Sequence, residues 1–425
     1  MRTRTTTIGG LVDDGTLVIN DGHRMKSSEL VDEDGLPFIR GGDVSEGRID
    51  FGSVDYIDEE LKSTFVNKVS QDGDVVITTK GSVGRFAFVR SIYPEFVYSP
   101  QLSFWRVKDS SEVLPRYLWQ WARSPELKKQ LGMYKGQTTM ADYISLEDQR
   151  KIEIDLPPLP IQRRIADILG ALDDKIELNR RMNETLEEMA QALYRHWFVD
   201  FGPFQDRELK DTEEMGPIPK GWEIKPFLDT CEIETGGTPK TSVDEYWGGD
   251  ILWASAKDVS QSTDAVLLDP ERTVTPAGIE NSPADVLPAG TTALVARGAT
   301  TGRHAILGRD MALNQSCYGL IGKDGYSWGW TYLTVDSLVK RLRKHAYGSA
   351  FDSVTISTFE NLDIVGAPPE VISAFKEKVM PLFKKMMANV KENQTLAEIR
   401  DYLLPKLISG EIKVEAAQEV VEAEM

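Results

Sequence analysis

Two short segments carry basic residues on glycine turns and could contact a nucleic acid. Residues 73–88 read GDVVITTKGSVGRFAF, and residues 290–306 read GTTALVARGATTGRHAI. In each segment an apolar run of strand character meets a cation, a glycine, a short polar turn, a second glycine and an arginine. A glycine beside Lys or Arg lets the backbone approach a phosphate closely, and Arg can also bind a guanine edge through two hydrogen bonds. For one copy alone, a surface hairpin with solvated charges would be the better interpretation.

The recurrence of this turn keeps DNA contact open beside the solvated hairpin. Residues 75–94 and 286–309 each contain three Lys or Arg residues and no acid. A helix-like segment with a basic end and a glycine-containing loop follow each copy. Two similar modules on a fixed spacer would also suit a bipartite DNA target. The candidate DNA-binding residues are Lys80, Arg85, Lys135, Gln137, Arg297 and Arg303.

The sequence offers no pattern for catalysis. Residues 155–159 (DLPPL) superficially resemble the Asp/Asn-Pro-Pro-aromatic loop of amino-methyltransferases, but a leucine follows the acid and no aromatic follows the prolines. Residues 236–241 (GGTPKT) lack the glycine that precedes the lysine of a phosphate loop, and Pro239 removes an amide donor. Cys231 and Cys317 have neither a disulfide framework nor metal-ligand spacing, and the four histidines are scattered. We therefore expect a non-catalytic binding or assembly component.

Length and charge limit the alternatives further. A chain of 425 residues should form more than one domain. Its formal net charge of −18 argues against simple non-specific DNA binding. No apolar run is long enough to span a membrane, and residues 1–10 do not resemble a secretory signal. The expected location is a reducing cytoplasm.

Two long helices are predicted to position the glycine turns. Alternate steps of four and three residues through 165–197 and through 375–407 collect mainly apolar positions, which is the spacing of a coiled-coil seam. Each seam carries two asparagines at the same steps, and a buried Asn fixes register at a cost in stability. Two unrelated amphipathic helices that share a phase are the plain alternative. The predicted pairing residues are Ile165, Leu169, Leu172, Ile176, Asn179, Asn183, Leu186, Leu193, Phe375, Val379, Leu382, Met386, Asn389, Asn393, Leu396 and Leu403.

The whole chain reads as an imperfect repeat at an offset of roughly 210 residues. Residues 43–45 (DVS) recur at 258–260, and a Pro-Pro pair precedes each long helix, where proline is well tolerated. Pro381 and Pro405 lie inside the second helical pattern and predict a kink or a helix in two pieces.

The repeat predicts an α+β protein with two similar mixed α/β domains and two long helices. Both parallel and antiparallel pairing of the helices remain open on these grounds. The predicted boundaries are a first domain at 1–156, a long helix at 157–201, a second domain at 202–367, a second long helix at 368–410 and a flexible acidic tail at 411–425.

Several motifs in the helices and at their borders carry a family resemblance. They are LPPLPIQ (156–162), DKI (174–176), RHWFVDF (195–201), PIPKGW (217–222) and RDYLLPKLISG (400–410). Together these motifs resemble the specificity (S) subunits of type I restriction-modification systems, which defend cells against foreign DNA.

The resemblance implies a non-catalytic subunit whose two target-recognition domains each read one half of a split, double-stranded DNA sequence. It implies a pseudo-twofold arrangement in which the helices pair as an antiparallel coiled coil, set the unspecified spacer and dock two methyltransferase (M) subunits. Restriction (R) subunits would then join the complex. S-adenosylmethionine, ATP and magnesium would belong to these partners, and no membrane would be involved. A coiled-coil scaffold without a direct DNA role, or part of a fused DNA methyltransferase, are the alternatives.

Overall fold

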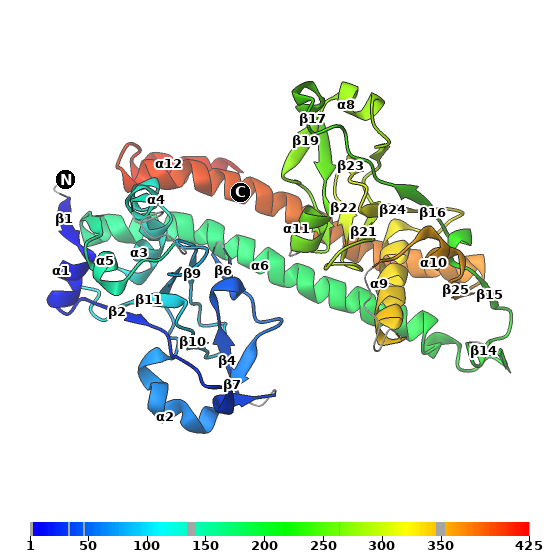
Figure 1. The fold of residues 1–425 in the computed structure, drawn as a ribbon, viewed down its shortest axis with the longest axis horizontal. Coiled ribbons are helices and arrows are strands. Elements are labelled where there is room, and N and C mark those ends of the chain that lie inside the picture. The colour runs from blue at the N-terminus through cyan, green and yellow to red at the C-terminus, as the bar shows by residue number, and fades with distance from the viewer. Residues whose placement is uncertain are drawn as a thin grey trace. The chain divides into compact units, whose positions relative to one another are not determined.

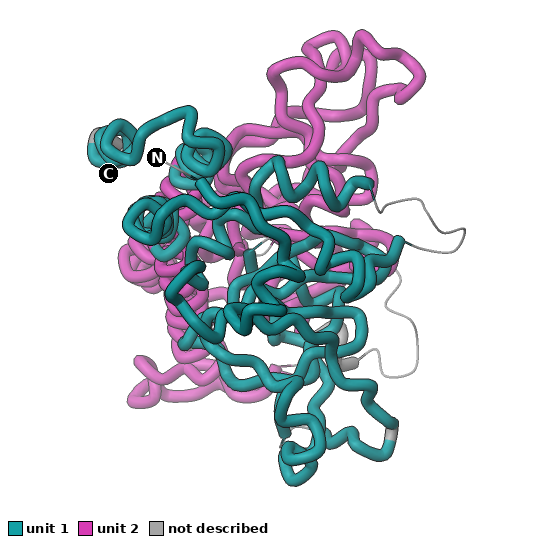
Figure 2. The backbone as a smooth tube through the Cα atoms, turned by 90° about the vertical axis from the view of Figure 1, so that its left-hand side faces the viewer, with its two compact units in different colours: residues 1–174, 396–425 teal, residues 175–395 magenta. Residues whose placement is uncertain are grey.

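The computed structural model describes residues 3–32, 35–45, 47–133, 142–213, 215–262, 264–345 and 353–424. They group into two compact units (Figure 2). Unit 1 comprises residues 1–174 and 396–425, and unit 2 comprises residues 175–395. The long helices α6 (Leu159–Phe198) and α11 (Pro369–Ile408) each contribute one segment to both units.

Unit 1 is built on two four-stranded sheets (Figure 1). The first sheet has the order β2 (Leu17–Asp21), β11 (Leu102–Val107), β8 (Val75–Thr78) and β9 (Phe86–Phe88). The second has the order β10 (Val97–Tyr98), β4 (Leu36–Ile39), β7 (Asp55–Ile57) and β3 (Leu30–Val31). Two short pairings join β1 (Arg4–Thr7) to β12 (Glu153–Leu156) and β5 (Val44–Ser45) to β6 (Arg48–Ile49). The α-helices are α1 (Ile8–Asp13), α2 (Lys62–Phe65), α3 (Pro115–Ala122), α4 (Pro125–Gly132), α5 (Leu146–Arg150) and α12 (Val414–Glu424).

Unit 2 contains a five-stranded and a four-stranded sheet. The five-stranded sheet has the order β16 (Cys231–Thr235), β24 (Cys317–Gly322), β21 (Thr292–Val295), β22 (His304–Leu307) and β18 (Val266–Leu267). The four-stranded sheet has the order β19 (Arg272–Val274), β17 (Trp247–Ala254), β23 (Met311–Leu313) and β20 (Val286–Leu287). Two further pairings join β13 (Leu209–Lys210) to β14 (Ile218–Pro219) and β15 (Glu223–Pro226) to β25 (Asp363–Gly366). The α-helices are α7 (Ala256–Gln261), α8 (Pro276–Glu280), α9 (Trp328–His345) and α10 (Ile356–Glu360).

The same strand pairings recur in the two units. The antiparallel series β2–β11–β8–β9 of unit 1 corresponds to β16–β24–β21–β22 of unit 2. The series β7–β4–β10 corresponds to β19–β17–β23, because each has one antiparallel and one parallel pairing. The predicted α+β class with an internal repeat is therefore confirmed.

Strands β8 and β21 are the centres of these repeated sheets. Each has a neighbouring strand on both sides, and all four residues of each strand are buried. A strand covered on both faces needs apolar or hydrogen-bonded side chains throughout, which explains the near-continuous apolar runs in the sequence. The glycine turns leave the carboxyl ends of these two strands, so their starting points are fixed by buried structure.

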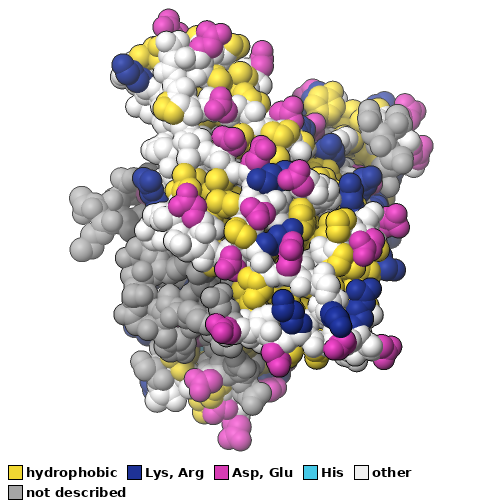
Figure 3. Space-filling model, turned by 90° about the vertical axis from the view of Figure 1, so that its right-hand side faces the viewer, with side chains coloured by type: hydrophobic (Ala, Val, Ile, Leu, Met, Phe, Trp, Pro, Cys, Tyr) yellow, Lys and Arg dark blue, Asp and Glu magenta, His cyan; other side chains and the backbone are white. Residues whose placement is uncertain are grey.

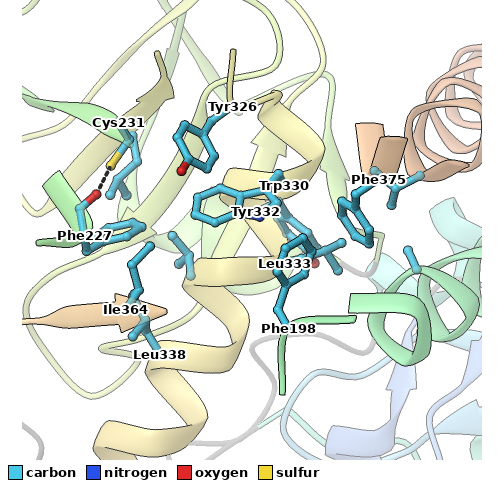
Figure 4. Packing of buried hydrophobic residues seen from close by; sticks show 14 of the residues in the cluster. Phe198, Phe227, Cys231, Tyr326, Trp330, Tyr332, Leu333, Leu338, Ile364 and Phe375 are labelled. Carbon is cyan, nitrogen blue, oxygen red and sulfur yellow. Dashed lines mark hydrogen bonds between the residues drawn. The ribbon is translucent and has the colours of Figure 1, made fainter. Parts of the chain in front are cut away.

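Aromatic side chains hold the globular part of unit 2 to its segments of the long helices (Figure 4). The ring centroid of Phe198 from α6 lies 4.8 Å from that of Phe375 in α11 and 6.4 Å from that of Trp330 in α9. All three side chains are buried. Edge-to-face contacts of this kind stabilise a core beyond the area that they bury. Helices α6, α9 and α11 therefore share one core in unit 2.

The segments of α6 and α11 in unit 2 pair antiparallel. Asn389 donates from Nδ2 to Oδ1 of Asn183 over 2.8 Å, and Asn179 donates from Nδ2 to Oδ1 of Asn393 over 3.0 Å. The partner numbers fall along α11 as they rise along α6. This is the orientation that the family resemblance implied.

The predicted pairing residues differ in how deeply they are buried. Twelve of them are buried, and Leu186, Leu193, Leu382 and Asn393 are half-buried. The four asparagines among them form the hydrogen bonds between α6 and α11 in unit 2, and we name these two pairs the asparagine ladder.

One of the two alternatives predicted for the second helix, a helix in two pieces, is wrong. α11 runs without a break from Pro369 to Ile408, so Pro381 and Pro405 do not divide it into two pieces. Each proline removes one backbone hydrogen bond from a helix interior, at a cost of roughly 3 kcal/mol. Neighbouring side chains such as Phe383 and Leu404 are buried, and their burial offsets this loss.

The chain beyond α11 also departs from expectation. Residues predicted as a flexible acidic tail form the helix α12. Val414, Ala417 and Val421 are buried at helical spacing, which gives α12 an apolar stripe. Glu415 pairs with Arg164 at the beginning of α6. Burial of these three side chains stabilises the helix although most of the other residues in the tail are polar or charged.

Candidate nucleic-acid interface

The first glycine turn is a tight connection between β8 and β9. The backbone N–H of Thr78 donates to the carbonyl of Arg85 over 3.0 Å, and that of Gly84 donates to the carbonyl of Thr78 over 3.0 Å. Gly81 and Gly84 have φ of 76° and 87°. Glycine reaches this left-handed region without the penalty of a Cβ atom, so the turn requires glycine at both positions.

The second turn, between β21 and β22, has the same construction. The N–H of Val295 donates to the carbonyl of Arg303 over 2.8 Å, and that of Gly302 donates to the carbonyl of Val295 over 2.8 Å. Gly298 and Gly302 also have positive φ, 100° and 85°. The additional residue of this copy is accommodated where the Thr301 hydroxyl donates to the carbonyl of Gly298. The two turns therefore present their flanking residues in equivalent ways.

A backbone bridge places the first cation of each turn at an equivalent position. Lys80 pairs with Tyr143 through an isolated antiparallel bridge, and Arg297 pairs with Ser353 in the same way. The Nζ atom of Lys80 also lies 5.3 Å from the ring centroid of Tyr143. These bridges fix where each cation leaves the backbone while its head group stays in solvent.

The four basic residues predicted on the turns are exposed. Lys80, Arg85, Arg297 and Arg303 are exposed, and no ion pair to any of them occurs within the described part of the chain. Arg85 makes a long contact of 3.5 Å from Nη1 to the carbonyl of Val44. An exposed cation without an acidic partner keeps its charge available for an anion. Of the other predicted contacts, Lys135 and Gln137 lie outside the described residues.

Lys128 of α4 stands beside the first turn. It lines a cavity of about 430 Å³ with Gly81, Gly84 and Arg85. The helix-like segment that follows the first turn in the sequence is two helices, α3 and α4, since Ser124 caps α4 and Pro125 occupies its first turn. Proline disfavours helical backbone at the residue before it. The break turns the basic end of α4 toward the glycine turn.

A buried ionic cluster was not predicted from the sequence. Asp173 of α6 is 7% exposed and accepts hydrogen bonds from Arg123 Nη2 at 2.7 Å and from Arg400 Nη1 at 3.2 Å. Gln120 and Trp119 also donate to this carboxylate. Burial opposes its charge, but the two arginines and Gln120 outweigh burial and hold the pKa of Asp173 below its ordinary value. The cluster ties α3 to both long helices within unit 1.

The sequence did contain a signal for this cluster. Arg400 is the one charged residue on either predicted seam, at the step where the first seam has Ala190. At the seam offset, Asp173 corresponds to Phe383, which is buried against the rings of Trp328 and Tyr332 in unit 2. The two units therefore use ionic and aromatic contacts at corresponding places on the long helices.

Neither cysteine is a reactive group. Cys231 and Cys317 are free and buried, and burial raises the pKa of each thiol to about 12. Across the described ranges, three or more His, Cys, Asp or Glu side chains do not gather as metal ligands. Within those ranges no helix is long and apolar enough to cross a bilayer.

Comparison with known proteins supplies the decisive observation. The family described as "Type I restriction modification DNA specificity domain" matches residues 13–188 and 219–369, which is more than half of the chain. The chain belongs to this family. The two matched ranges follow the internal repeat, and each contains one glycine turn.

Individual relatives agree with this assignment. The chain is 27% identical to the type I restriction enzyme HindI specificity subunit of Haemophilus influenzae, over 88% of this chain and 94% of that one. It is 25% identical to the MjaIX specificity subunit of Methanocaldococcus jannaschii, over 82% and 79%. A crystal structure of the type I restriction-modification S subunit from M. genitalium covers 96% of each chain with a TM-score of 0.55 at 13% identity, which shows a shared fold. As a specificity subunit, the protein recognises DNA sequence and is not itself the catalyst.

Proposed function

We propose that each unit of this specificity subunit binds one half of a split, double-stranded DNA target. The recurrence of the same glycine turn, with exposed cations at matched positions in both units, carries this proposal. Lys80 and Arg85 would contact the DNA from unit 1, and Arg297 and Arg303 from unit 2. Glycine at the turn lets the backbone come close to a phosphate, while arginine supplies hydrogen bonds to phosphates or base edges.

The long helices would fix the number of unspecified base pairs between the half-sites. α6 is one helix of 40 residues, about 60 Å long at ~1.5 Å per residue, and it passes from unit 1 into unit 2 without a break. The Asn183–Asn389 hydrogen bond would hold α6 and α11 in one register. A spacer built from paired helices is stiffer than a loop of the same number of residues.

The partners that we propose are two methyltransferase (M) subunits and, in the full complex, restriction (R) subunits in the cytoplasm. S-adenosylmethionine, ATP and magnesium would bind to those subunits. The net charge of −18 supports such partners, because a strongly acidic chain needs additional positive surface to hold DNA. On the face shown in Figure 3, Lys and Arg are interspersed with Asp and Glu, which suits local contact with DNA rather than general attraction.

Paired substitutions in the assembled methyltransferase complex test the proposed contacts. Lys80→Ala with Arg85→Ala, and separately Arg297→Ala with Arg303→Ala, should each weaken DNA binding by roughly tenfold or more. Each pair should also reduce the slope of log affinity against log salt concentration by up to about two. Affinity titrations at several salt concentrations would measure both effects.

Lys62→Ala with Lys151→Ala is a matched control in unit 1. These lysines form ion pairs with Glu95 and Asp148, so the same loss of two charges removes no proposed DNA contact. If both test pairs bind like the control pair, the contact residues are wrong. If the wild-type complex prefers no sequence, the chain acts as a coiled-coil scaffold without a direct DNA role.

A further inference from the structure

An exposed arginine of unit 2 lies over a tryptophan ring and is not part of the glycine turn. The guanidinium carbon of Arg272 in β19 lies 3.4 Å from the ring centroid of Trp247 and 5.7 Å from that of Trp253. Arg272 is exposed, and it forms no ion pair with any residue that the structure describes. Stacking on an indole limits the rotamers of the arginine, so binding through its guanidinium costs less side-chain entropy.

The two tryptophans connect this arginine to the loop at residues 236–240. Trp253 donates from Nε1 to the carbonyl of Gly237 over 3.0 Å, and Trp247 donates from Nε1 to the carbonyl of Lys240 over 3.3 Å. Lys240 is also exposed and has no ion-pair partner among the described residues. The stack is therefore part of an ordered edge and not an isolated surface contact.

The same loop joins this edge to the second glycine turn. The Thr238 hydroxyl donates to the side-chain oxygen of Gln315, which is exposed. The next residue, Ser316, accepts at its carbonyl from the N–H of Ala296 over 2.8 Å, immediately before Arg297. We name the exposed side chains along this line the unit 2 edge; they are Arg272, Lys240, Gln315 and Arg297.

Unit 1 has the same backbone but different side chains at two of these positions. Asp55 of β7 pairs with Phe38 of β4, and Arg272 of β19 pairs with Trp253 of β17. Asp55 is therefore the residue of unit 1 that corresponds to Arg272. Asp55 forms an ion pair with Arg40, so no free cation stands there. Ser99 and Asn314 directly follow the corresponding strands β10 and β23, and their N–H groups make equivalent backbone hydrogen bonds to β4 and β17. The next residue is therefore Pro100 in unit 1 and Gln315 in unit 2.

We propose that Arg272 is a base-reading residue for the half-site bound by unit 2, and that guanine is the base that it reads. This inference rests on the proposed function of the two units. Arginine is the side chain that binds the O6 and N7 atoms of guanine with two parallel hydrogen bonds in the major groove. Gln315 lies on the same edge and has the chemistry to bind the N6 and N7 atoms of an adenine. Unit 1 has Asp55 and Pro100 at the positions of Arg272 and Gln315, so it would read a different half-site.

The test compares sequence preference in the assembled methyltransferase complex. Wild-type protein and the variants Arg272→Ala and Arg272→Lys would be bound to duplex libraries in which each half-site is randomised in turn. Wild-type protein should require a guanine at one position of one half-site. Arg272→Ala should reduce that preference by roughly 5- to 150-fold and leave the other half-site unchanged. Arg272→Lys keeps a cation over the indole but loses the planar two-pronged donor, so it should weaken the preference for guanine less than Arg272→Ala does.

Each alternative has its own outcome. Arg309→Ala is the matched control, because Arg309 lies in unit 2 and contacts Asp269 and Gln394 away from the edge. If both Arg272 variants keep the wild-type preference, the inference is overturned. Equal weakening on all sequences would make Arg272 a phosphate contact, which also overturns base reading. Absence of any split preference in wild-type protein would instead defeat the proposed function, and thermal melting of each variant complex would identify a folding defect.

Discussion

At the scale of single residues, Asp173 shows how one carboxylate can hold several elements together. It is buried between Arg123 and Arg400, and the pKa of Arg400 is raised because Asp173 and Asp401 outweigh the effect of burial. A buried charge that loses its partner is costly, since the remaining charges stay desolvated. The main effect of the Asp173 carboxylate on stability is therefore that it neutralises the charges of Arg123 and Arg400.

Asp173→Asn should destabilise unit 1 by roughly 3 kcal/mol at neutral pH, because two half-buried guanidinium groups lose their buried counter-ion. The folded-state pKa of Asp173 lies below its unfolded value of about 3.9. The stabilisation from its charge is therefore complete above that unfolded value and is lost as the pH falls through the folded-state pKa. Urea unfolding at pH 7 and at successively lower pH would show the variant approaching wild-type stability in acid.

Asp174→Asn is the neighbouring control. Asp174 is 43% exposed and pairs with Arg90 and Arg116, so its loss should cost about 1 kcal/mol or less. Equal destabilisation by the two substitutions would contradict the distinct role given to the buried carboxylate.

At the scale of elements, periodicity and punctuation in the sequence were enough to predict the long helices. The heptad spacing and the proline pairs placed their beginnings within two residues of Leu159 and Pro369. Continuity of α11 was beyond such rules, because the penalty for Pro381 is local and the burial that offsets it comes from distant segments. For the ionic cluster, the sequence showed only that Arg400 is a charged residue on the seam, since Asp173 and Arg123 meet it only in the folded chain.

The asparagine ladder should fix the register of α6 and α11 and lower the stability of their pairing. Asn389 and Asn179 each leave a buried side-chain oxygen without a hydrogen-bond partner in the described structure. Replacing Asn183 and Asn389 together by leucine should therefore raise the unfolding midpoint of the protein, as removal of a buried polar pair does in coiled coils. Thermal unfolding of the double variant would measure this change.

The single variants separate register from simple loss of packing. Asn389→Ala alone should lower stability by about 1–3 kcal/mol, because Asn183 then keeps an unpaired buried amide oxygen. A double leucine variant less stable than wild type would show that the ladder is needed for stability itself.

At the scale of the whole molecule, the internal repeat gives one chain two units with the same backbone and different exposed side chains. The strand pairings and glycine turns of the two units agree, while side chains at corresponding places differ, as with Asp55 and Arg272. The repeat and the two turns were predictable from the sequence, since glycine, proline and apolar runs reflect local backbone needs. The edge formed by Arg272 and Gln315 was not, because it depends on pairing between strands far apart in the chain.

The most direct test of the central claim is a map of modified bases across a genome in which this chain is expressed with its methyltransferase partner. Two reading units joined by continuous helices predict one split motif, with two specified half-sites and a gap of constant length. Modified bases within a single continuous short motif, or half-sites with a variable gap, would contradict the account.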